Sequence, residues 1–575
     1  MLTLAPFSRR NSQKSWKTGG KTRRRRMKES QDYETRSQEY KAITAREITL
    51  TIGIFFDGTG NNRENTALRM RGFTESDAEQ GQAQSCKVSP GGENNENLTI
   101  NSDSVTTNSY RGYFSNIHWL NSLYTSQQQL AEDQIEAQIK TYLSGIGTAT
   151  GRPDSMIGMG LGSSMLDIFE GVVTKTDEAM VAMTNAIAEF MQCNPSPDFS
   201  IAKIQFDVFG FSRGAAAARH FANRVMEQDP DIAHAIAKGL DGDLYGGKPS
   251  GEVRFIGLFD TVAAIGGIKD LFDTNGRSNA DVKLELRPSV AKKVFQITAM
   301  HECRYNFSLN SIKGMWPEFA LPGVHSDIGG GYNPAGSDWQ ENENLFLTMP
   351  AFEVVSDDTL ETATTVFRKA ELAREKLYSV AALQYLLPHG KVTTKTRSVE
   401  GVNAYQQRTG IIQKQVGAAV FLERTAVPND WAKVSLRVML DAAQDAGVLL
   451  NPIRHTDEEL QLPPELIPLG EKAIAQGKAV RLGQTPQSFT EDELHTIGKY
   501  IHCSANWNIA SDRNQWIDPK AGETCINHFA PNEDKAIVFT NSPNNEWVRT
   551  VWYMDDEQRL HDDEVTPEDQ TANVP

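Results

Sequence analysis

One segment, residues 204–220, constrains the fold of this chain more than any other. Apolar side chains alternate along residues 204–209, which is the pattern of a buried strand. The alanines at 215–218 then favour a helix. Between the two lies the sequence Gly-Phe-Ser-Arg-Gly, with Ser212 at its centre. We therefore predict a strand, a tight turn and a helix, with Ser212 at the apex of the turn.

The G-x-S-x-G spacing is that of the nucleophile elbow of serine hydrolases. Gly210 and Gly214 would let the strained turn close and the helix pack tightly against the strand. The N-terminus of the helix would then face the point where an oxyanion forms, and the backbone N–H of Arg213 would be one donor to it. Ordinary turns can share this spacing, so the role of Ser212 depends on the rest of the chain.

Length and charge narrow the class of protein. A chain of 575 residues has room for roughly two to four domains, or for one enlarged domain with appendages. The formal net charge of −16 argues against broad nucleic-acid binding and provides no long-range attraction to anionic lipid. The cysteines are scattered and odd in number, without metal-site spacing, so we expect reduced thiols and no bound metal.

The N-terminal residues 1–44 are polar and basic and lack apolar periodicity, which predicts a disordered basic arm. They could instead be a binding arm, or leader sequence upstream of a later start such as Met27. Ser8, Arg9 and Arg10 are followed by polar residues rather than an apolar segment, so we expect no export signal peptide and synthesis in a bacterial cytoplasm. No run approaches the ~20 apolar residues that a membrane-spanning helix needs.

Apolar runs predict three further strands, over 48–56, 253–259 and 294–299. The intervening sequence predicts helices over 110–124, 127–142 and 163–192. Parallel strands separated by helices indicate an α/β fold with a doubly wound, mostly parallel sheet. Residues 63–109 are rich in Asn, Ser, Gly and Glu, and we expect a long surface insertion there.

The first of these strands ends in the polar turn Asp57, Gly58 and Thr59. In an α/β hydrolase such a loop can supply the second oxyanion-hole N–H, here from Gly58 or Thr59. A rival interpretation is a phosphatase with a nucleophilic aspartate in a D-x-D-G-T motif. Phe55 stands where that motif needs a carboxylate, which disfavours the phosphatase.

Two further residues complete a catalytic constellation with Ser212. Asp260 follows the strand over 253–259, and His325 lies in the glycine-rich loop over 321–332. The three repeat the Ser…Asp…His order of the α/β-hydrolase fold. In that chemistry the histidine takes the serine proton and returns it to the leaving group, while the aspartate holds the imidazole in the correct tautomer.

Other residues compete for these roles. His301 and His220 are the alternative bases. Asp207 is the alternative acid, but it lies inside the strand that leads to the elbow, whereas Asp260 ends a separate strand. We expect Asp327, two residues beyond the candidate base, to hold the loop in place.

The region over 346–552 carries no chemical motif and predicts a mainly helical accessory region that caps the site or binds a partner. Its candidate helices lie over 361–387, 432–446 and 469–476, with Gly477 ending the last. Residues 553–575 read as a solvated acidic tail.

Four motifs together resemble the first class of type VI secretion lipase effectors. They lie at 55–61, 210–214, 259–262 and 322–332, in the order of that family. The resemblance covers about residues 48 to 335 and implies an α/β-hydrolase catalytic domain over 45–345. It also implies a phospholipase A that degrades the membrane glycerophospholipids of rival bacteria through an acyl-enzyme. It assigns the nucleophile to Ser212, the acid to Asp260 and the base to His325, with no cofactor.

The resemblance further implies two protein partners, a type VI secretion spike protein and an immunity protein. It implies action at the membrane surface in the periplasm of the target cell. Neither the arm over 1–44 nor the insertion over 63–109 matches the family pattern. Two alternatives remain open, a soluble carboxylesterase that uses the same triad and a non-enzymatic secreted toxin or adaptor.

Overall fold

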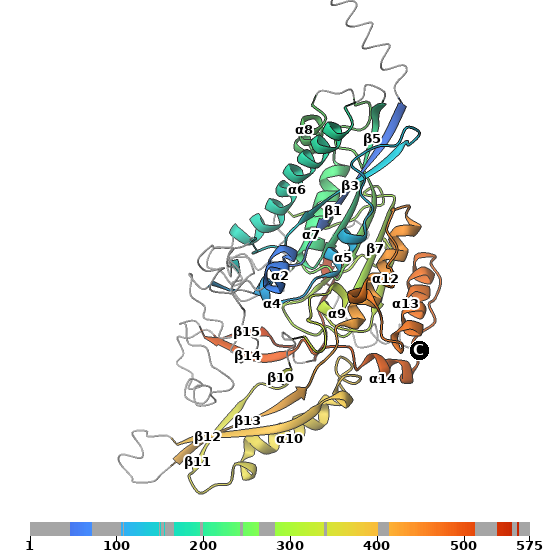
Figure 1. The fold of residues 1–575 in the computed structure, drawn as a ribbon. Coiled ribbons are helices and arrows are strands. Elements are labelled where there is room, and N and C mark those ends of the chain that lie inside the picture. The colour runs from blue at the N-terminus through green and yellow to red at the C-terminus, as the bar shows by residue number, and fades with distance from the viewer. Residues whose placement is uncertain are drawn as a thin grey trace, which may run out of the picture.

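The fold is organised around a six-stranded sheet in which every neighbouring pair of strands is parallel (Figure 1). The computed structural model describes residues 46–71, 105–106, 108–148, 150, 154–155, 166–195, 199–241, 245–263, 282–337, 342–400, 413–511, 537–544, 546–554 and 560–562. Across the sheet the strands are β3 (Glu136–Leu143), β1 (Arg46–Phe56), β5 (Phe199–Phe211), β6 (Glu252–Phe259), β7 (Lys293–Ala299) and β9 (Glu318–Leu321). The predicted α/β fold with a mostly parallel sheet is confirmed.

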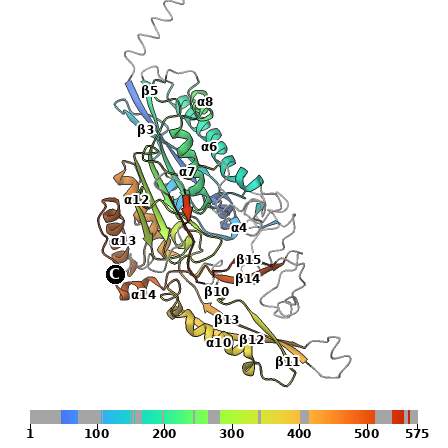
Figure 2. The same cartoon turned by 180° about the vertical axis from the view of Figure 1, so that it is seen from behind.

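Helices cover both faces of this sheet, as Figures 1 and 2 show. On one face lie α6 (Leu166–Cys193), α7 (Arg213–Met226) and α8 (Pro230–Gly239). On the other lie α5 (Asn116–Leu123), α12 (Asp430–Asp445) and α13 (Leu466–Arg481). Because helices cover both faces of the sheet, side chains on both sides of each strand are buried, which explains why the strand sequences are near-continuous apolar runs.

The second helical layer corrects the expected division of the chain. Trp431 on α12 is fully buried, and it shares a hydrophobic cluster with Phe209 of β5 and Phe259 of β6. α12 and α13 therefore complete the core of the sheet domain, although they lie within the range expected to be a separate accessory region. Only packing in three dimensions assigns them to that core.

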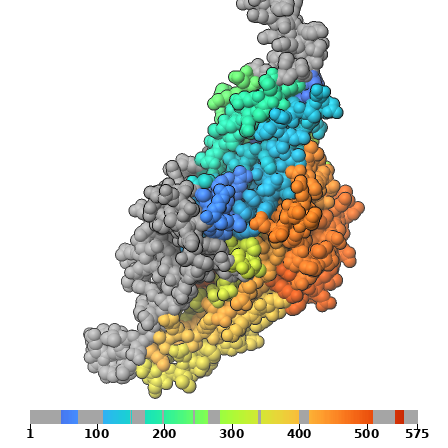
Figure 3. Space-filling view, viewed as in Figure 1, coloured from blue at the N-terminus to red at the C-terminus, as the bar shows by residue number. Residues whose placement is uncertain are grey.

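A separate lobe lies in sequence between α9 and α12 and projects from the sheet domain (Figure 3, yellow). It contains the antiparallel strands β10 (Glu343–Phe346), β11 (Ala351–Ser356), β12 (Lys391–Glu400) and β13 (Gln413–Arg424). Helix α10 (Thr365–Leu377) packs on β13, and Val366 and Val420 lie in a common buried cluster. The helix of this lobe lies within the helical region predicted over 361–387, whereas its strands were not predicted.

The remaining elements are short. They are α2 (Arg63–Met70), β2 (Val105–Thr106), α4 (Asn108–Arg111), β4 (Asp154–Ser155), β8 (Leu309–Asn310), α9 (His325–Gly329), η3 (Glu361–Ala363), η4 (Leu387–His389), η5 (Glu458–Leu460), α14 (Glu491–Ile497), β14 (Asn506–Ser511), β15 (Ile537–Asn541), β16 (Val551–Met554) and β17 (Leu560–Asp562). Among the described residues, no helix is both long and apolar enough to cross a bilayer.

Three local predictions are wrong. Residues 136–143 form β3 rather than the end of a helix, because the strand is buried beside β1 and tertiary pairing overrides local propensity. Residues 63–70 form α2 with Asn65 and Thr66 buried, so the surface insertion does not begin there. Helix α13 continues past Gly477, where a Cβ would come within 2.8 Å of the Val438 side chain, so this glycine allows α12 and α13 to approach closely.

The four core strands, α6 and α12 are confirmed. Two predicted helices are shorter than expected: only 365–377 of the region over 361–387 forms α10, and residues 112–115 separate α4 from α5 in the region over 110–124. The arm over 1–44 and residues 72–104 of the insertion lie outside the described residues. The same is true of the acidic tail, apart from residues 553–554 and 560–562.

Candidate active site

Ser212 lies between β5 and α7 with φ 58° and ψ −125°, a backbone conformation that L-residues rarely adopt. The two flanking glycines make this turn possible. A Cβ at Gly210 would come within 2.4 Å of the Gly214 carbonyl oxygen, and one at Gly214 within 2.3 Å of the Asp57 carbonyl oxygen. The predicted strand, tight turn and helix are confirmed. Strain of this kind in a non-glycine residue is typical of functional sites.

The register of the sheet brings Asp260 beside the elbow. Phe211 pairs with Phe259, so Ser212 and Asp260 are the next residues at the carboxyl ends of adjacent strands. The Ser212 N–H donates to the Phe259 carbonyl oxygen at 3.1 Å. This edge of a parallel sheet is where α/β enzymes place their reacting groups.

His325 begins α9 and reaches the same edge. Its Nδ1 lies 2.6 Å from Oδ2 of Asp260, and its ring lies against Phe211, the residue before the candidate nucleophile. The loop that carries the histidine is held from α12, because the indole N–H of Trp431 donates to the carbonyl oxygen of Pro322. The structure thus gathers the three candidate catalytic residues at one place.

Burial and charge set the protonation of this pair. Burial by itself would raise the pKa of Asp260, but the charge of Arg549 and the hydrogen bond with His325 outweigh it and hold the pKa well below its usual range. Burial lowers the pKa of His325, and the neighbouring Asp260 carboxylate offsets only part of that effect. The imidazole is therefore neutral near neutral pH and able to accept a proton.

The candidate oxyanion donors are not equivalent. The Gly58 N–H already donates to Oδ1 of Asp57 at 2.7 Å, so it is committed within its own turn. No hydrogen bond between described residues uses the Thr59 N–H. Arg213 is the first residue of α7, where backbone N–H groups lack intrahelical partners. The geometry favours Thr59 over Gly58 as the donor from this turn.

Asp57 has a structural role. It is buried and accepts hydrogen bonds from the Ser115 hydroxyl and the Tyr142 hydroxyl, both at 2.6 Å. Burial raises its pKa to about 6, although these hydrogen bonds act in the opposite direction. A carboxylate enclosed in this way is not available as a nucleophile, so the phosphatase interpretation finds no support.

The competing residues also have other partners. Nδ1 of His301 accepts from the Gly323 N–H, and Nδ1 of His220 accepts from the Lys283 N–H, each at 3.0 Å. Burial lowers the pKa of both histidines to about 4. Neither is paired with a carboxylate through that nitrogen, unlike His325.

The two competing aspartates are likewise engaged elsewhere. Asp207 accepts hydrogen bonds from Arg254 and from the Tyr124 hydroxyl. Asp327 accepts from the Val324 N–H at 3.0 Å and lies 2.7 Å from Nδ1 of His502. The expectation that Asp327 holds the loop in place is confirmed.

Comparisons with known proteins identify the family of this chain. Residues 243–357, which include Asp260 and His325, match the family described as the type VI secretion phospholipase effector Tle1-like catalytic domain. A solved structure of the Tle1 effector bound to the VgrG spike from the type VI secretion system is 66% identical to this chain, with a TM-score of 0.72. The match covers 89% of this chain and 94% of that one. This chain belongs to the Tle1 family of type VI secretion phospholipase effectors.

Two other comparisons add nothing to the assignment. A crystal structure of an uncharacterized protein from Pseudomonas aeruginosa is 16% identical, with a TM-score of 0.35 and coverage of 84% of this chain and 56% of that one. That likeness is too low to carry an argument. No curated protein matches the chain.

Sequence reasoning missed one charged residue of this Tle1-family site. Arg549 donates from both terminal nitrogens to the two oxygens of Asp260, at 2.7 and 2.8 Å. It lies 289 residues from the aspartate in sequence, in a segment without a motif. No local signal could have identified it.

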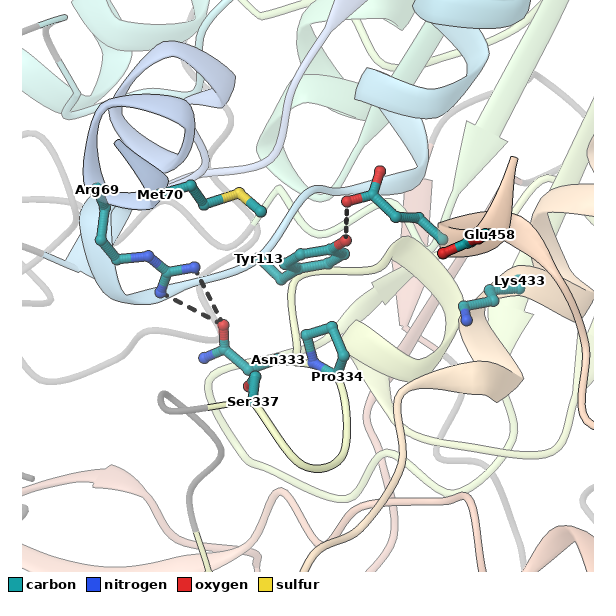
Figure 4. A pocket seen from close by; sticks show the side chains of 9 residues that line it. Arg69, Met70, Tyr113, Asn333, Pro334, Ser337, Lys433 and Glu458 are labelled. Carbon is teal, nitrogen blue, oxygen red and sulfur yellow. Dashed lines mark hydrogen bonds between the residues drawn. The ribbon is translucent and has the colours of Figure 1, made fainter. Parts of the chain in front are cut away.

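A pocket of about 400 Å³ lies apart from the catalytic residues (Figure 4). Arg69 contacts Asn333 on one side of it, and the Tyr113 hydroxyl donates to Glu459 at 3.0 Å on the other. The Tyr113 N–H also donates to the carbonyl oxygen of Gly331, just after α9. Neither the candidate nucleophile nor the base lines this pocket, so we do not place the reaction there.

Proposed function

We propose that this Tle1-family protein is a serine phospholipase A that hydrolyses acyl esters of membrane glycerophospholipids. One observation carries the proposal above all others. The 2.6 Å contact between His325 and a buried, ionised Asp260 occurs at the sheet edge where Ser212 occupies a strained elbow. This is the arrangement that activates a serine hydroxyl towards an ester.

The reaction follows from the roles of these groups. The Ser212 hydroxyl attacks the ester carbonyl carbon while Nε2 of His325 takes its proton. The N–H groups of Arg213 and Thr59 stabilise the oxyanion, and His325 then protonates the departing lysophospholipid oxygen. Water, deprotonated by the same imidazole, attacks the acyl-enzyme and releases the fatty acid. Asp260 stabilises the imidazolium in both halves of the reaction.

The biological setting is proposed from the family. The relative is bound to the VgrG spike, and we propose that this chain also travels on a spike protein. We propose further that it acts against rival bacteria at the membrane surface in the target periplasm. An immunity protein would protect the producing cell.

The test is fatty-acid release from phospholipid vesicles by the full-length chain. Ser212→Ala and His325→Ala should each lose activity by several orders of magnitude, because nucleophile and base act as a unit. His301→Ala is the matched control, since it removes a buried histidine that has no carboxylate partner on Nδ1 and should retain most activity.

Two other outcomes would replace the proposal. Equal activity on short monomeric esters, without activation by a lipid surface, would favour a soluble carboxylesterase. Toxicity that survives in Ser212→Ala would favour a non-enzymatic toxin or adaptor. Activity lost in His301→Ala but kept in His325→Ala would reassign the base.

A further inference from the structure

The acid of the candidate triad is held by an ion pair from the far end of the chain. Both terminal nitrogens of Arg549 lie within 2.8 Å of the two carboxylate oxygens of Asp260. The side chains are 4% and 0% exposed, so the ion pair is shielded from bulk water. Oδ1 of the aspartate also accepts the Ala299 N–H at 2.9 Å, and Oδ2 contacts His325. Every donor to the carboxylate is thus a fixed group of the protein.

A short strand delivers this arginine to the site. Residues of β16 pair in parallel with β8, Val551 with Leu309 and Trp552 with Asn310. The Leu309 N–H donates to the Thr550 carbonyl oxygen at 2.9 Å, which anchors the strand one residue from the arginine. The segment that carries Arg549 is therefore built into the catalytic domain.

The same guanidinium also supports the wall beside the base. Its Nε donates to the carbonyl oxygen of Phe307 at 2.6 Å. The Phe307 ring packs edge-on against the imidazole of His325, with centroids 5.0 Å apart, and the guanidinium of Arg304 lies 3.3 Å from the centroid of the Phe307 ring. Arg549 thus contacts the acid directly and the base through one aromatic residue.

We propose that Arg549 is a positioning residue of the catalytic site, which keeps Asp260 ionised and oriented towards Nδ1 of His325. The inference rests on the proposed serine-hydrolase function. A carboxyl group with no exposure to water favours its neutral form unless a cation compensates. A protonated Asp260 would no longer hold the tautomer in which Nδ1 carries the proton and Nε2 is the base.

The other charges near Asp260 do not replace this cation. His325 is neutral at rest, and Arg304 is paired with Glu302, which accepts from its Nη2 at 2.7 Å. Glu302 also accepts the N–H of His325 at 3.2 Å and so adds negative charge nearby. Without Arg549, Asp260 would lose the cation that contacts it directly, while Glu302 would keep Arg304.

The chain contains a matched control pair. Arg254 also forms a bidentate ion pair with an unexposed aspartate: its Nε and Nη2 lie 2.9 and 2.6 Å from the two carboxylate oxygens of Asp207. Asp207 lies inside β5 rather than at the catalytic edge of the sheet. Arg254→Gln therefore breaks an equivalent ion pair without touching the triad.

The experiment compares Arg549→Gln, Arg549→Lys and Arg254→Gln in the full-length chain. The first readout is the pH profile of kcat/KM on a monomeric ester, with thermal unfolding of each variant. Arg549→Gln should lose about 10²- to 10⁴-fold at neutral pH, and the acid limb of its profile should move to higher pH by at least about one unit. Arg549→Lys keeps one positive charge and should show a smaller shift.

The second readout does not need turnover. The proton between Nδ1 of His325 and Asp260 should give a low-field proton NMR resonance in the wild type and in Arg254→Gln. In Arg549→Gln this resonance should disappear at a pH where the wild type retains it. An unchanged acid limb and an unchanged resonance in Arg549→Gln would overturn the inference. So would equal losses in Arg549→Gln and Arg254→Gln that follow only the melting temperature.

The two proposals fail in distinguishable ways. A wild type that hydrolyses no ester or phospholipid contradicts the proposed function, while the resonance still tests the role of Arg549. An active wild type with an unaltered Arg549→Gln contradicts the inference alone. If Arg549→Gln does not fold, the pH profile of Arg549→Lys tests the inference instead. A lysine cannot form both hydrogen bonds to Asp260, so the acid limb of this profile should still move to higher pH.

Discussion

The ring of Phe211 lies against the imidazole of His325, with centroids 4.6 Å apart and an interplanar angle of 33°. Because Phe211 precedes Ser212, this contact joins the strand that leads to the candidate nucleophile to the helix that begins with the candidate base. Gly329, at the end of α9, lies directly over the same ring: a Cβ there would come within 2.0 Å of it. The distance between the two candidate catalytic residues therefore depends on a glycine that is adjacent to neither of them in sequence.

Gly329→Ala should displace either the Phe211 ring or α9. We expect a loss of about 1–3 kcal/mol in the free energy of unfolding, the usual cost of overpacking a core, and a larger proportional loss of activity. Urea unfolding and ester hydrolysis measure the two effects. Gly336→Ala is a poor control because its φ is 76°, so Gly246→Ala, which meets no atom within 4 Å, serves instead. Wild-type activity in Gly329→Ala would contradict this account of the contact.

Gly214→Ala tests the approach of α7 to the end of β1. A methyl group at position 214 would lie 2.3 Å from the Asp57 carbonyl oxygen and 2.4 Å from that of Phe56, and these backbone atoms cannot rotate away. We expect the turn that carries Thr59 to move away from the elbow, with a fall in kcat greater than the change in KM. Steady-state kinetics separate the two parameters, and Gly246→Ala is again the control. A change in KM alone would show that the turn does not act in the transition state.

Two substitutions at Thr59 separate the role of its backbone N–H from the role of its side chain. Thr59→Pro deletes the donor, and we expect a loss of about 10²- to 10³-fold in kcat, as for other oxyanion-hole donors. Thr59→Ala keeps the N–H and should retain most of the rate. The two variants should be compared at equal folded fraction, measured by circular dichroism. Equal activity in both would exclude Thr59 as a donor and return attention to Gly58.

The lowered pKa of Glu302 predicts how the free energy of unfolding depends on pH. Burial by itself would raise its pKa, but the charge and hydrogen bonds of Arg304 and the charge of Arg549 lower it to about 2. The carboxylate therefore contributes stability that is fully present above its unfolded pKa of about 4.3 and is lost as the pH falls towards 2. A shift of this size corresponds to about 3 kcal/mol.

Glu302→Gln should remove that dependence. We expect the free energy of unfolding to vary less between about pH 4 and about pH 2 than in the wild type, and to be lower near neutral pH because Arg304 loses its partner. Urea titrations at several pH values measure both effects. Glu178→Gln, at the surface in a pair with Lys175, should leave the curve nearly unchanged. If the free energy of unfolding of Glu302→Gln changed with pH as steeply as that of the wild type, the prediction would be contradicted.

Much of the site could be predicted from the sequence because its signals are local. The G-x-S-x-G spacing specifies a turn in which only glycine fits at 210 and 214, and the structure has that turn. Asp260 follows a strand and His325 lies in a glycine-rich loop, and parallel strands bring their carboxyl ends to one edge of the sheet. The order of these residues along the chain was therefore enough to propose them.

The sequence could not decide which turn N–H is available. Gly58 and Thr59 are adjacent and both suit an oxyanion hole, but the Asp57 side chain occupies the Gly58 N–H. That side chain is turned inward by Ser115 and Tyr142, which come from α5's N-cap and from β3. The segment that became β3 was predicted to be part of a helix over 127–142.

What the sequence by itself determined was the α/β class, the elbow and the three candidate catalytic residues, since each depends on contacts between near neighbours or on regular strand order. Only the tertiary structure decided that α12 and α13 cover the sheet, that Glu302 contacts the start of α9, and that Arg549 pairs with Asp260. These depend on burial of charge and apolar surface between segments that are separated in sequence, by 23 residues for Glu302 and His325 and by 289 for Asp260 and Arg549. Such contacts leave no periodicity or motif in either segment, because the physical constraint lies in the space that the two segments share.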